Sequence, residues 1–365
     1  MNRGPLAEID LSALQHNLET VRKIIDKRPV IAVVKADAYG HGSVEIARRL
    51  VGLGVTHLAV AYTGEAKLLR ESGISAEIIV LFDRSDIEDY FTYGLVPVVQ
   101  DKGTAREFGV EAVKRGRSIR VHMKVDTGMG RIGFMPEKAV CDAVEISGWE
   151  GIELAGLMSH FSEADLADRS YALHQLKLFN EIRSAISARI GRPLMSHIAN
   201  SAAVLTFKDA LMDAVRPGLL LYGSSPFQDG FGLRPLMTIK TRVLAVRSLC
   251  AGTPVSYGRT FVAKNDCKIA VVPVGYADGY NRLFSNNGEM LVCGGRAPVA
   301  GRVCMDVTML DVTGIGGVCE GDEVVILGRQ GNETITAADL AARIGTISYE
   351  ILTSLGGRSR REYIN

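Results

Sequence analysis

The apolar run Val30–Val34 ends in a lysine, Lys35, and a tyrosine, Tyr39, follows four residues later. Burial disfavours a charged ammonium, so a lysine that leaves a fully apolar strand is expected to have a lowered pKa. A neutral amine is what imine formation with a carbonyl compound requires. A lysine at a strand end is more often solvated or bound to an anion, and a tyrosine more often packs. It is therefore the context of Lys35 that makes it a candidate for catalysis.

Further polar side chains follow later apolar runs. They are Lys124 and Arg131 near the end of 119–125, His160 after 152–158, His197, Asn200 and Ser201 around 194–198, and Arg216 and Gly218 in 213–218. Each has an ordinary alternative, such as a core histidine, a helix cap for the Asn-Ser pair, or a buried turn. If the runs are strands of one parallel sheet, however, these side chains meet at one edge, where barrel enzymes carry their chemistry.

The elements that must position these residues alternate regularly. Short β-branched runs recur about eight times, with further examples at 57–61, 77–82 and 95–99, and helical patterns such as 43–54 and 170–191 separate them. Strand followed by helix, repeated eight times, predicts a parallel (β/α)8 barrel. An open doubly wound sheet is the alternative, and the lack of a GxGxxG motif at the first helix disfavours it.

The texture of the sequence changes after Gly232. The helical spacers shrink, and long β-rich runs separated by Gly- and Asp-containing turns take their place. This pattern predicts a second, mostly antiparallel β domain, with the barrel at 1–232 and the β domain at 233–365. Within it, Thr336 followed three residues later by Asp339 predicts a capped helix over 336–345.

Composition excludes several classes of protein. The chain of 365 residues has a net charge of +1, which favours neither nucleic acid nor an anionic membrane surface as a partner. No apolar run approaches the roughly 18 residues of a membrane helix, and the N-terminal stretch lacks the apolar core of a signal peptide. The six cysteines form no CxxC pair, so we expect reduced thiols in a cytoplasmic protein. No metal-ligand motif is present, so no metal site is predicted.

Nine stretches together resemble the alanine racemase family. They are AVVKADAYGHG, KVDTGMGRIGF, LMSHF, HIANSAA, RPGLLLYG, VSYGRTF, VGYADGY, GRVCMDVTM and SYEILTSLG, in the order of the family and across both predicted domains. The resemblance implies a (β/α)8 barrel with a C-terminal β domain, pyridoxal 5′-phosphate as cofactor, and a head-to-tail homodimer with shared active sites. It also implies interconversion of L- and D-alanine, which supplies D-alanine for bacterial peptidoglycan.

The resemblance also assigns roles residue by residue. It implies that Lys35 and the partner subunit's Tyr257 are the two catalytic bases, for the D and the L face respectively. The implied cofactor-binding residues are Lys35, Tyr39, His160, Asn200, Ser201, Arg216, Gly218, Leu219 and Tyr349, with His197 behind Arg216. The implied substrate contacts are Arg131 and Met305, the lysine often carbamylated in the family is Lys124, and the entry residues are Tyr276, Arg282 and Asp306. Asp37 departs from the family, in which asparagine is common at this position.

Three alternatives stay open beside this interpretation. A serine-preferring or broad-specificity racemase would share most of the same motifs. A related barrel-type decarboxylase would call for a different partner of the pyridine nitrogen, and RPGLLLYG argues against it. A catalytically silent protein that binds pyridoxal phosphate would typically be a barrel alone, so the predicted β domain and Tyr257 disfavour it.

Overall fold

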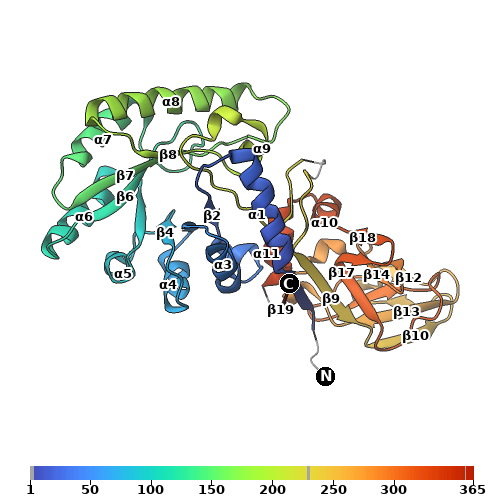
Figure 1. The fold of residues 1–365 in the computed structure, drawn as a ribbon. Coiled ribbons are helices and arrows are strands. Elements are labelled where there is room, and N and C mark those ends of the chain that lie inside the picture. The colour runs from blue at the N-terminus through green and yellow to red at the C-terminus, as the bar shows by residue number, and fades with distance from the viewer. Residues whose placement is uncertain (1–3, 228–230, 358) are drawn as a thin grey trace.

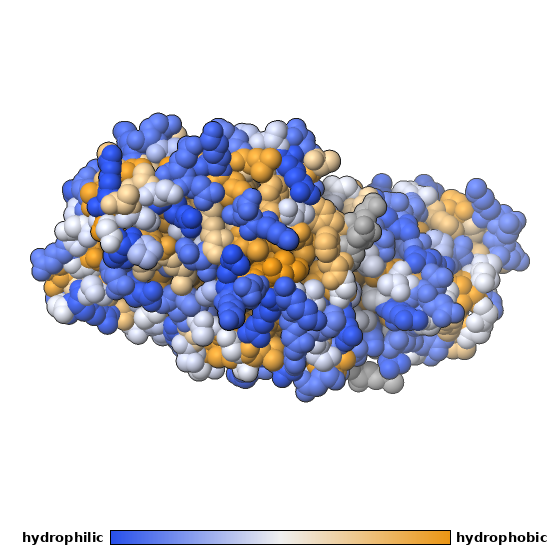
Figure 2. Space-filling model, turned by 45° about the horizontal axis from the view of Figure 1, so that its top comes forward, coloured by the Kyte–Doolittle hydropathy of each residue, from blue (hydrophilic) through white to orange (hydrophobic). Residues whose placement is uncertain are grey.

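The chain folds into two lobes joined along one edge (Figure 1). The computed structural model describes residues 4–227, 231–357 and 359–365. The larger lobe holds the parallel strands and the long helices, and the smaller lobe holds most of the antiparallel strands. On the face shown in Figure 2, hydrophilic residues cover much of both lobes, and a hydrophobic region lies at the centre of the larger lobe.

The larger lobe is built on seven parallel strands that follow one another in chain order. These are β2 (Ile31–Val33), β3 (His57–Val60), β4 (Glu77–Val80), β5 (Val96–Val99), β6 (Ile119–Lys124), β7 (Ile152–Met158) and β8 (Met195–His197). Nearly every residue of these strands is buried, as expected for a parallel sheet covered on both faces. All seven lie within the runs from which the sequence predicted strands, so the predicted fold class is confirmed.

The eighth predicted strand, 213–218, differs from the prediction, because it forms a single bridge rather than a regular strand. Val215 pairs in parallel with Val30, and the Ile31 N–H donates to the Val215 carbonyl at 2.8 Å. On its other side the Arg216 N–H donates to the Ala199 carbonyl at 2.9 Å. The segment therefore connects both edges of the sheet and closes the ring. The Val33 N–H also donates to the Pro217 carbonyl at 3.0 Å, but Pro217 has no N–H to donate in return, so no second bridge forms.

Helices connect successive strands and lie outside them (Figure 1). They are α1 (Leu11–Ile25), α2 (Lys35–Tyr39), α3 (Ser43–Gly52), α4 (Thr63–Glu71), α5 (Ile87–Thr92), α6 (Lys102–Lys114), α7 (Pro136–Ser147), α8 (Ser170–Ile190) and α9 (Ser201–Thr206), with a 3₁₀ turn η1 (Lys208–Ala210). In α3, Ile46, Ala47 and Leu50 are completely buried, and this spacing forms the single apolar face that anchors the helix to the barrel. The predicted helices at 43–54 and 170–191 correspond to α3 and α8.

The smaller lobe contains two main sheets. The larger follows the order β15 (Gly295–Pro298), β14 (Glu289–Val292), β17 (Glu323–Gln330), β9 (Met237–Arg242), β1 (Leu6–Asp10) and β19 (Arg360–Ile364), with β18 (Glu333–Ile335) beside β17. The smaller contains β10 (Ala245–Leu249), β13 (Cys267–Val272) and β16 (Thr308–Asp311), and β11 (Pro254–Val255) pairs with β12 (Phe261–Val262). Three short 3₁₀ turns are η2 (Tyr257–Arg259), η3 (Tyr276–Asp278) and η4 (Arg282–Phe284).

Both ends of the chain meet in this second lobe. The first strand, β1, pairs in parallel with the last, β19, and antiparallel with β9. The predicted domain boundary between 232 and 233 stays a prediction, but β1 shows that the sheet of the second lobe also takes in the first strand of the chain. Sequence patterns did not indicate this, since a five-residue run gives no sign of its partners.

Two helices close the chain. In α10 (Ala337–Ile344) the Thr336 side chain accepts from the Asp339 N–H at 3.1 Å, and Asp339 accepts from the Thr336 N–H at 2.8 Å, which confirms the predicted capping box. The next helix, α11 (Ser348–Gly356), lies against α2 of the barrel lobe, and a Cβ on Gly40 would meet the Leu352 carbonyl oxygen at 2.4 Å. Within the described ranges, no helix is both long enough and apolar enough to span a bilayer.

Candidate active site

A cavity of about 230 Å³ opens at the carboxyl ends of the barrel strands. Its wall contains ten of the residues that the sequence singled out, namely Lys35, Tyr39, Lys124, Arg131, His160, Asn200, Ser201, Arg216, Gly218 and Tyr349. Leu219 lies next to Gly218 and is buried. The structure thus brings together side chains that are spread over more than three hundred positions of the chain.

Lys35 follows β2 directly and lies in an apolar but strongly cationic surrounding. Burial lowers its pKa, and the nearby guanidinium groups of Arg131 and Arg216 lower it further, while the Glu65 carboxylate acts in the opposite direction. The Lys35 amine lies 5.6 Å from the centre of the Phe82 ring. The predicted shift of this amine toward its neutral form therefore has two physical causes, loss of water and repulsion by like charge.

The turn after Lys35 has an unusual backbone. Four consecutive residues without glycine, Ala36–Tyr39, have φ between 52° and 54°, in the left-handed region. Such a conformation costs roughly 1–2 kcal/mol per residue, so surrounding contacts must hold it. One is Glu65, whose Oε1 accepts the Ala36 N–H at 2.6 Å and whose Oε2 accepts the Ala61 N–H at 2.7 Å. The turn carries both Lys35 and Tyr39 into the cavity.

Arg216 is the most completely bound cation of the site. Its Nη1 donates to His197 Nδ1 at 2.6 Å and to the His197 carbonyl at 2.8 Å, and its Nη2 donates to the Ser159 carbonyl at 2.6 Å. Burial lowers its pKa to about 9, which still leaves the guanidinium charged at neutral pH. Arginine can only donate hydrogen bonds, so any ligand atom that it faces in the cavity must be an acceptor.

These bonds also fix the proton positions of two buried histidines. Because Arg216 donates to His197 Nδ1, a neutral His197 carries its proton on Nε2 and donates to His122 Nδ1 at 2.9 Å. Burial lowers the pKa of both rings, to about 3 at His122, so both are neutral. Gly156 makes room for the second ring, because a Cβ there would lie 2.6 Å from it. His122 was not among the predicted residues, although it lies two positions before Lys124 in β6.

Another part of the cavity wall offers donors without side-chain bulk. A Cβ on Gly218 would lie 2.5 Å from the Tyr39 hydroxyl, so only glycine leaves this space open. The Gly218 N–H donates to Ser201 Oγ at 3.0 Å, which leaves the Ser201 hydroxyl proton free to donate. Within the described ranges, no acceptor is bonded to the Leu219 N–H. Hydroxyl and backbone N–H donors around an open space suit an anion such as phosphate.

A third group of residues surrounds Phe82, which the sequence analysis missed. The cationic ends of Lys124 and Arg131 lie 5.7 Å and 5.3 Å from its ring centre. The loop that carries Arg131 is held by Asp126, which accepts the N–H groups of Gly128, Met129, Gly130 and Arg131. Burial and the charge of Arg131 lower the pKa of Lys124 to about 8. The position of Phe82, at the end of an apolar run, was the signal that could have identified it.

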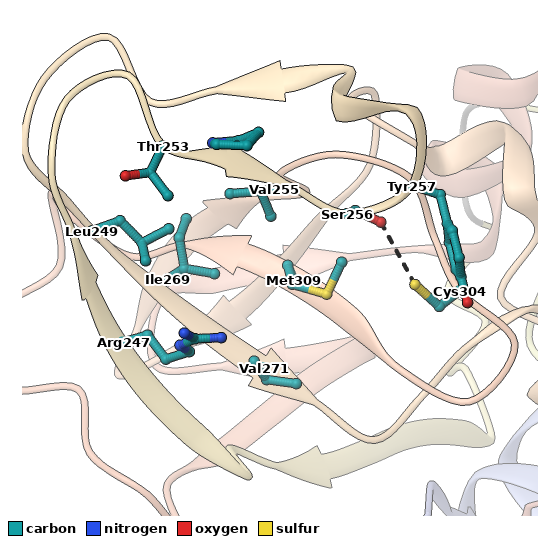
Figure 3. Close-up of a pocket in the computed structure, with 11 residues that line it drawn as sticks. Arg247, Leu249, Thr253, Val255, Ser256, Tyr257, Ile269, Val271, Cys304 and Met309 are labelled. Carbon is teal, nitrogen blue, oxygen red and sulfur yellow. Dashed lines mark hydrogen bonds between the residues drawn. The ribbon is translucent and has the colours of Figure 1, made fainter.

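The remaining predicted residues do not line this cavity. Tyr257, Tyr276, Arg282, Met305 and Asp306 all belong to the second lobe. Tyr257 borders a different pocket of about 430 Å³, where it lies beside Cys304 at one end of the wall (Figure 3). Tyr276 and Arg282 border a third, of about 350 Å³. Tyr257 is 68% exposed and Met305 54%. Within one chain, therefore, the barrel residues and the second-lobe residues form separate surfaces.

The fold and the cavity define a class: a (β/α)8-barrel protein with a partly buried lysine in a cavity at the carboxyl ends of its strands. Comparison with known proteins narrows this class. Residues 9–226 match the family described as alanine racemase, N-terminal domain, and residues 236–363 match alanine racemase, C-terminal domain. The chain therefore belongs to the alanine racemase family, and it is an isomerase.

Individual relatives agree with this assignment over their full lengths. An alanine racemase of Thermodesulfovibrio yellowstonii is 48% identical over 369 residues, covering 100% of this chain and 99% of the relative. The structure of alanine racemase from Streptomyces lavendulae superposes with a TM-score of 0.94 at 35% identity, covering 100% and 98% of the two chains. That from Bartonella henselae, described with covalently bound pyridoxal phosphate, gives 0.90 at 28% identity and covers 100% of both chains.

Proposed function

We propose that this chain binds pyridoxal 5′-phosphate in the barrel cavity and interconverts L- and D-alanine with two bases. One base is Lys35, and the other is Tyr257 from a second copy of the chain in a head-to-tail homodimer. The observation that carries the proposal is the convergence of Lys35, Arg216 and the open space beside Gly218 in one cavity. The relative with covalently bound pyridoxal phosphate supports the choice of cofactor.

The residues of the cavity fit the chemical groups of this cofactor. Lys35, with its lowered pKa, would hold the aldehyde carbon covalently. Tyr39, Ser201, Gly218, Leu219 and Tyr349 would hold the phosphate, with Asn200 on the same loop as Ser201. His160 would lie beside the ring, and Arg216 would face the ring nitrogen. The cofactor supplies the electron sink that makes the α-proton of the amino acid removable. The protein residues provide orientation, the proton carriers and exclusion of water.

Arg216 restricts what the cofactor can do. A guanidinium that is fixed by His197 and by the Ser159 carbonyl can donate to the ring nitrogen but cannot accept a proton from it. It would therefore disfavour a protonated ring nitrogen and so limit the electron sink that the cofactor supplies. Under this proposal Arg216 would suppress transamination, in which a proton returns to the wrong atom.

Racemisation requires a proton carrier on each face of the substrate carbon. Lys35 lines the cavity, and the two tyrosines that line it with Lys35, Tyr39 and Tyr349, are the ones proposed to hold the phosphate. Tyr257 projects from the second lobe, where the side chains of Val262, Tyr276, Leu283 and Met305 are also exposed. Exposed apolar side chains on one lobe are expected where another chain covers them. A second copy would cover this surface and carry Tyr257 to the Lys35 cavity.

The same docking would complete the substrate site. Arg131 would bind the substrate carboxylate, and the partner's Met305 would limit the space for the side chain to a methyl group. The partner's Tyr276, Arg282 and Asp306 would form the entry. In the cytoplasm of a bacterium, the product would supply D-alanine for peptidoglycan.

A substrate panel tests the proposed function. The purified chain, saturated with pyridoxal 5′-phosphate, is given L-alanine, L-serine and larger L-amino acids, and formation of each D-isomer is measured by chiral chromatography. We expect L-alanine to have the highest kcat/KM. Faster conversion of L-serine, or of several larger amino acids, would contradict the assignment of alanine as the preferred substrate. No conversion without the cofactor, and conversion with it, is the expected control result.

A further inference from the structure

The last strand of the chain reaches back to the left-handed turn that carries Lys35. Arg361, in β19, lies against this turn and makes three contacts with one guanidinium. Its Nη2 pairs with Asp37 Oδ2 at 2.6 Å and donates to the Gly356 carbonyl at 2.9 Å, and its Nε donates to the Gly40 carbonyl at 3.0 Å. One side chain thereby connects the turn, the end of α11 and the terminal strand.

Asp37, the partner of Arg361 in this ion pair, also connects the turn to α3. Its Oδ1 accepts the N–H of Ser43, the first residue of α3, at 2.7 Å. Its Oδ2 is left for Arg361. Because both oxygens are used by groups outside the turn, the aspartate ties the left-handed backbone to α3 and to β19 at the same time.

The backbone of the turn touches α11 without room for a side chain. A Cβ on Gly40 would lie 2.4 Å from the Leu352 carbonyl oxygen, and a Cβ on Gly356 would lie 2.2 Å from the Gly40 carbonyl oxygen. Gly40 itself has φ +84°. Arg361 bridges the carbonyls of these two glycines, so its guanidinium sits where the barrel lobe and the C-terminal elements approach most closely.

His41 completes the support from inside the barrel. Its Nδ1 lies 2.9 Å from the Ala38 carbonyl and 3.1 Å from the Tyr39 carbonyl, and since carbonyls only accept, the Nδ1 proton must donate. Burial lowers the pKa of this imidazole to about 4, so it stays neutral and keeps that single proton. The turn is thus held by a buried neutral donor on one side and by a charged pair on the other.

We propose that Arg361 and Asp37 form a clamp that positions the Lys35 amine and the Tyr39 hydroxyl in the cofactor cavity. The clamp acts through the backbone of Ala36–Tyr39, and neither member of the pair lines the cavity. The proposal rests on the proposed function, because the cofactor is the ligand that Lys35 and Tyr39 are positioned to bind. Loss of the clamp lets the strained turn relax toward ordinary backbone angles, which moves both side chains together.

The test measures local geometry and cofactor affinity separately from activity. The variants are Arg361→Met, which removes the guanidinium, Asp37→Asn, which keeps an oxygen for the Ser43 N–H, and the double variant. The matched control is Arg360→Met, because the Arg360 side chain is 56% exposed and pairs only with Glu362 among the described residues. For each full chain, pyridoxal 5′-phosphate affinity is measured by absorbance titration. Amide hydrogen exchange of the peptide covering 33–42 is measured by mass spectrometry.

We expect Arg361→Met to weaken cofactor affinity about tenfold and to speed exchange in the peptide 33–42. Asp37→Asn should act in the same direction with a smaller loss of about threefold, because asparagine, which is common at this position in the family, keeps an acceptor but not the charge. The double variant should be no worse than Arg361→Met alone, because both changes remove the same contact. Arg361→Lys, which keeps the charge but not the planar fork, should lie between Arg361→Met and the parent chain. Arg360→Met should match the parent in both measurements.

Two results would overturn the clamp. One is cofactor affinity within about twofold of the parent, with unchanged exchange at 33–42, in both single variants. The other is equal loss in Arg360→Met. If Arg361→Met fails to fold, Asp37→Asn and Arg361→Lys decide in the same way. Failure of the proposed function looks different, because the parent chain itself would then neither bind the cofactor nor racemise alanine.

Discussion

The two proposed bases lie in contrasting surroundings. Lys35 is enclosed at the end of β2, in a cavity whose charges and burial lower its pKa. Tyr257 lies in the second lobe, with 68% of its surface exposed. Within a single chain, therefore, the proposed base Lys35 lies in a formed cavity, whereas the proposed base Tyr257 is exposed at the surface.

The backbones of the two regions are nevertheless both held in place. The turn after Lys35 has left-handed angles, and so does the chain around Tyr257, with φ of 64° at Ser256 and 50° at Arg259. Ser256 Oγ donates to the Arg302 carbonyl at 2.6 Å. Strain that is maintained by side-chain contacts is characteristic of functional sites. The two regions thus differ in solvent exposure, and a second copy of the chain would bury the region around Tyr257.

Of the changes considered, removal of Lys35 should reduce the racemisation rate most. Lys35→Ala would remove both the proposed covalent attachment of the cofactor and one proposed proton carrier, so we expect racemisation to fall about 10³-fold or more. The measurement is the rate of D-alanine formation with the cofactor in excess. Lys177→Ala, at an exposed lysine of α8, is the control and should keep full activity. Full activity in Lys35→Ala would remove this residue from the mechanism.

Removing the exposed phenol should affect one direction more than the other. Tyr257→Phe would delete the proposed proton carrier of the L face, so we expect α-hydrogen exchange to slow about 10²-fold or more from L-alanine and less from D-alanine. Exchange into deuterium oxide, followed by NMR, measures both directions. Tyr62→Phe alters another exposed tyrosine, of the barrel lobe, and should change neither. Equal loss in both directions would contradict the assignment of faces.

A change at Arg216 should alter the ratio of transamination to racemisation more than the rate at which the α-proton is removed. Arg216→Glu replaces a group that can only donate with one that accepts, which favours a protonated ring nitrogen. We expect transamination, measured as pyruvate formation from alanine, to rise by about tenfold or more relative to racemisation. Arg216→Lys keeps the positive charge and should stay close to the parent ratio. No rise in pyruvate with glutamate at this position would refute the proposed restraint.

The smallest effect concerns Lys124. Its pKa of about 8 means that the amine is mostly charged below pH 8 and increasingly neutral above it. Only the neutral amine can add carbon dioxide, so a carbamate should grow as the pH rises through about 8, with the neutral fraction rising from roughly a tenth at pH 7 to roughly a half at pH 8. Carbon-13 NMR in labelled bicarbonate detects it. Lys124→Arg should show no such signal; a signal that persists there would place the carbamate elsewhere.

Whether a feature could be predicted from the sequence depended on how far apart in the chain its interacting residues lie. The parallel strands and α10 were predicted because alternation and capping are local patterns. Nine of the ten cavity residues were predicted because strand ends converge in any parallel barrel, and the family motifs named the same positions. The tenth, Tyr349, lies in α11 and was indicated by a family motif alone. The left-handed turn at Ala36–Tyr39 was not, because it depends on distant groups such as Glu65 and Arg361.

Other features were missed for the same reason. His122 looked like an ordinary strand residue, and only the bonds to His197 reveal its place behind Arg216. The run 213–218 is predicted as a full strand, but it forms one bridge, because Pro217 has no N–H for a second. The position of β1 beside β19 joins residues more than three hundred positions apart, which no local pattern records.

The central claim is that each active site takes its amine from one chain and its phenol from another, and subunit mixing tests it most directly. Lys35→Ala and Tyr257→Phe chains are combined under conditions that exchange subunits, and alanine racemisation is measured. A mixed dimer contains one intact site, so random exchange of equal amounts should restore roughly a quarter of the parent activity. Activity no greater than the average of the two separate variants, with mixed dimers shown to be present, would contradict the account.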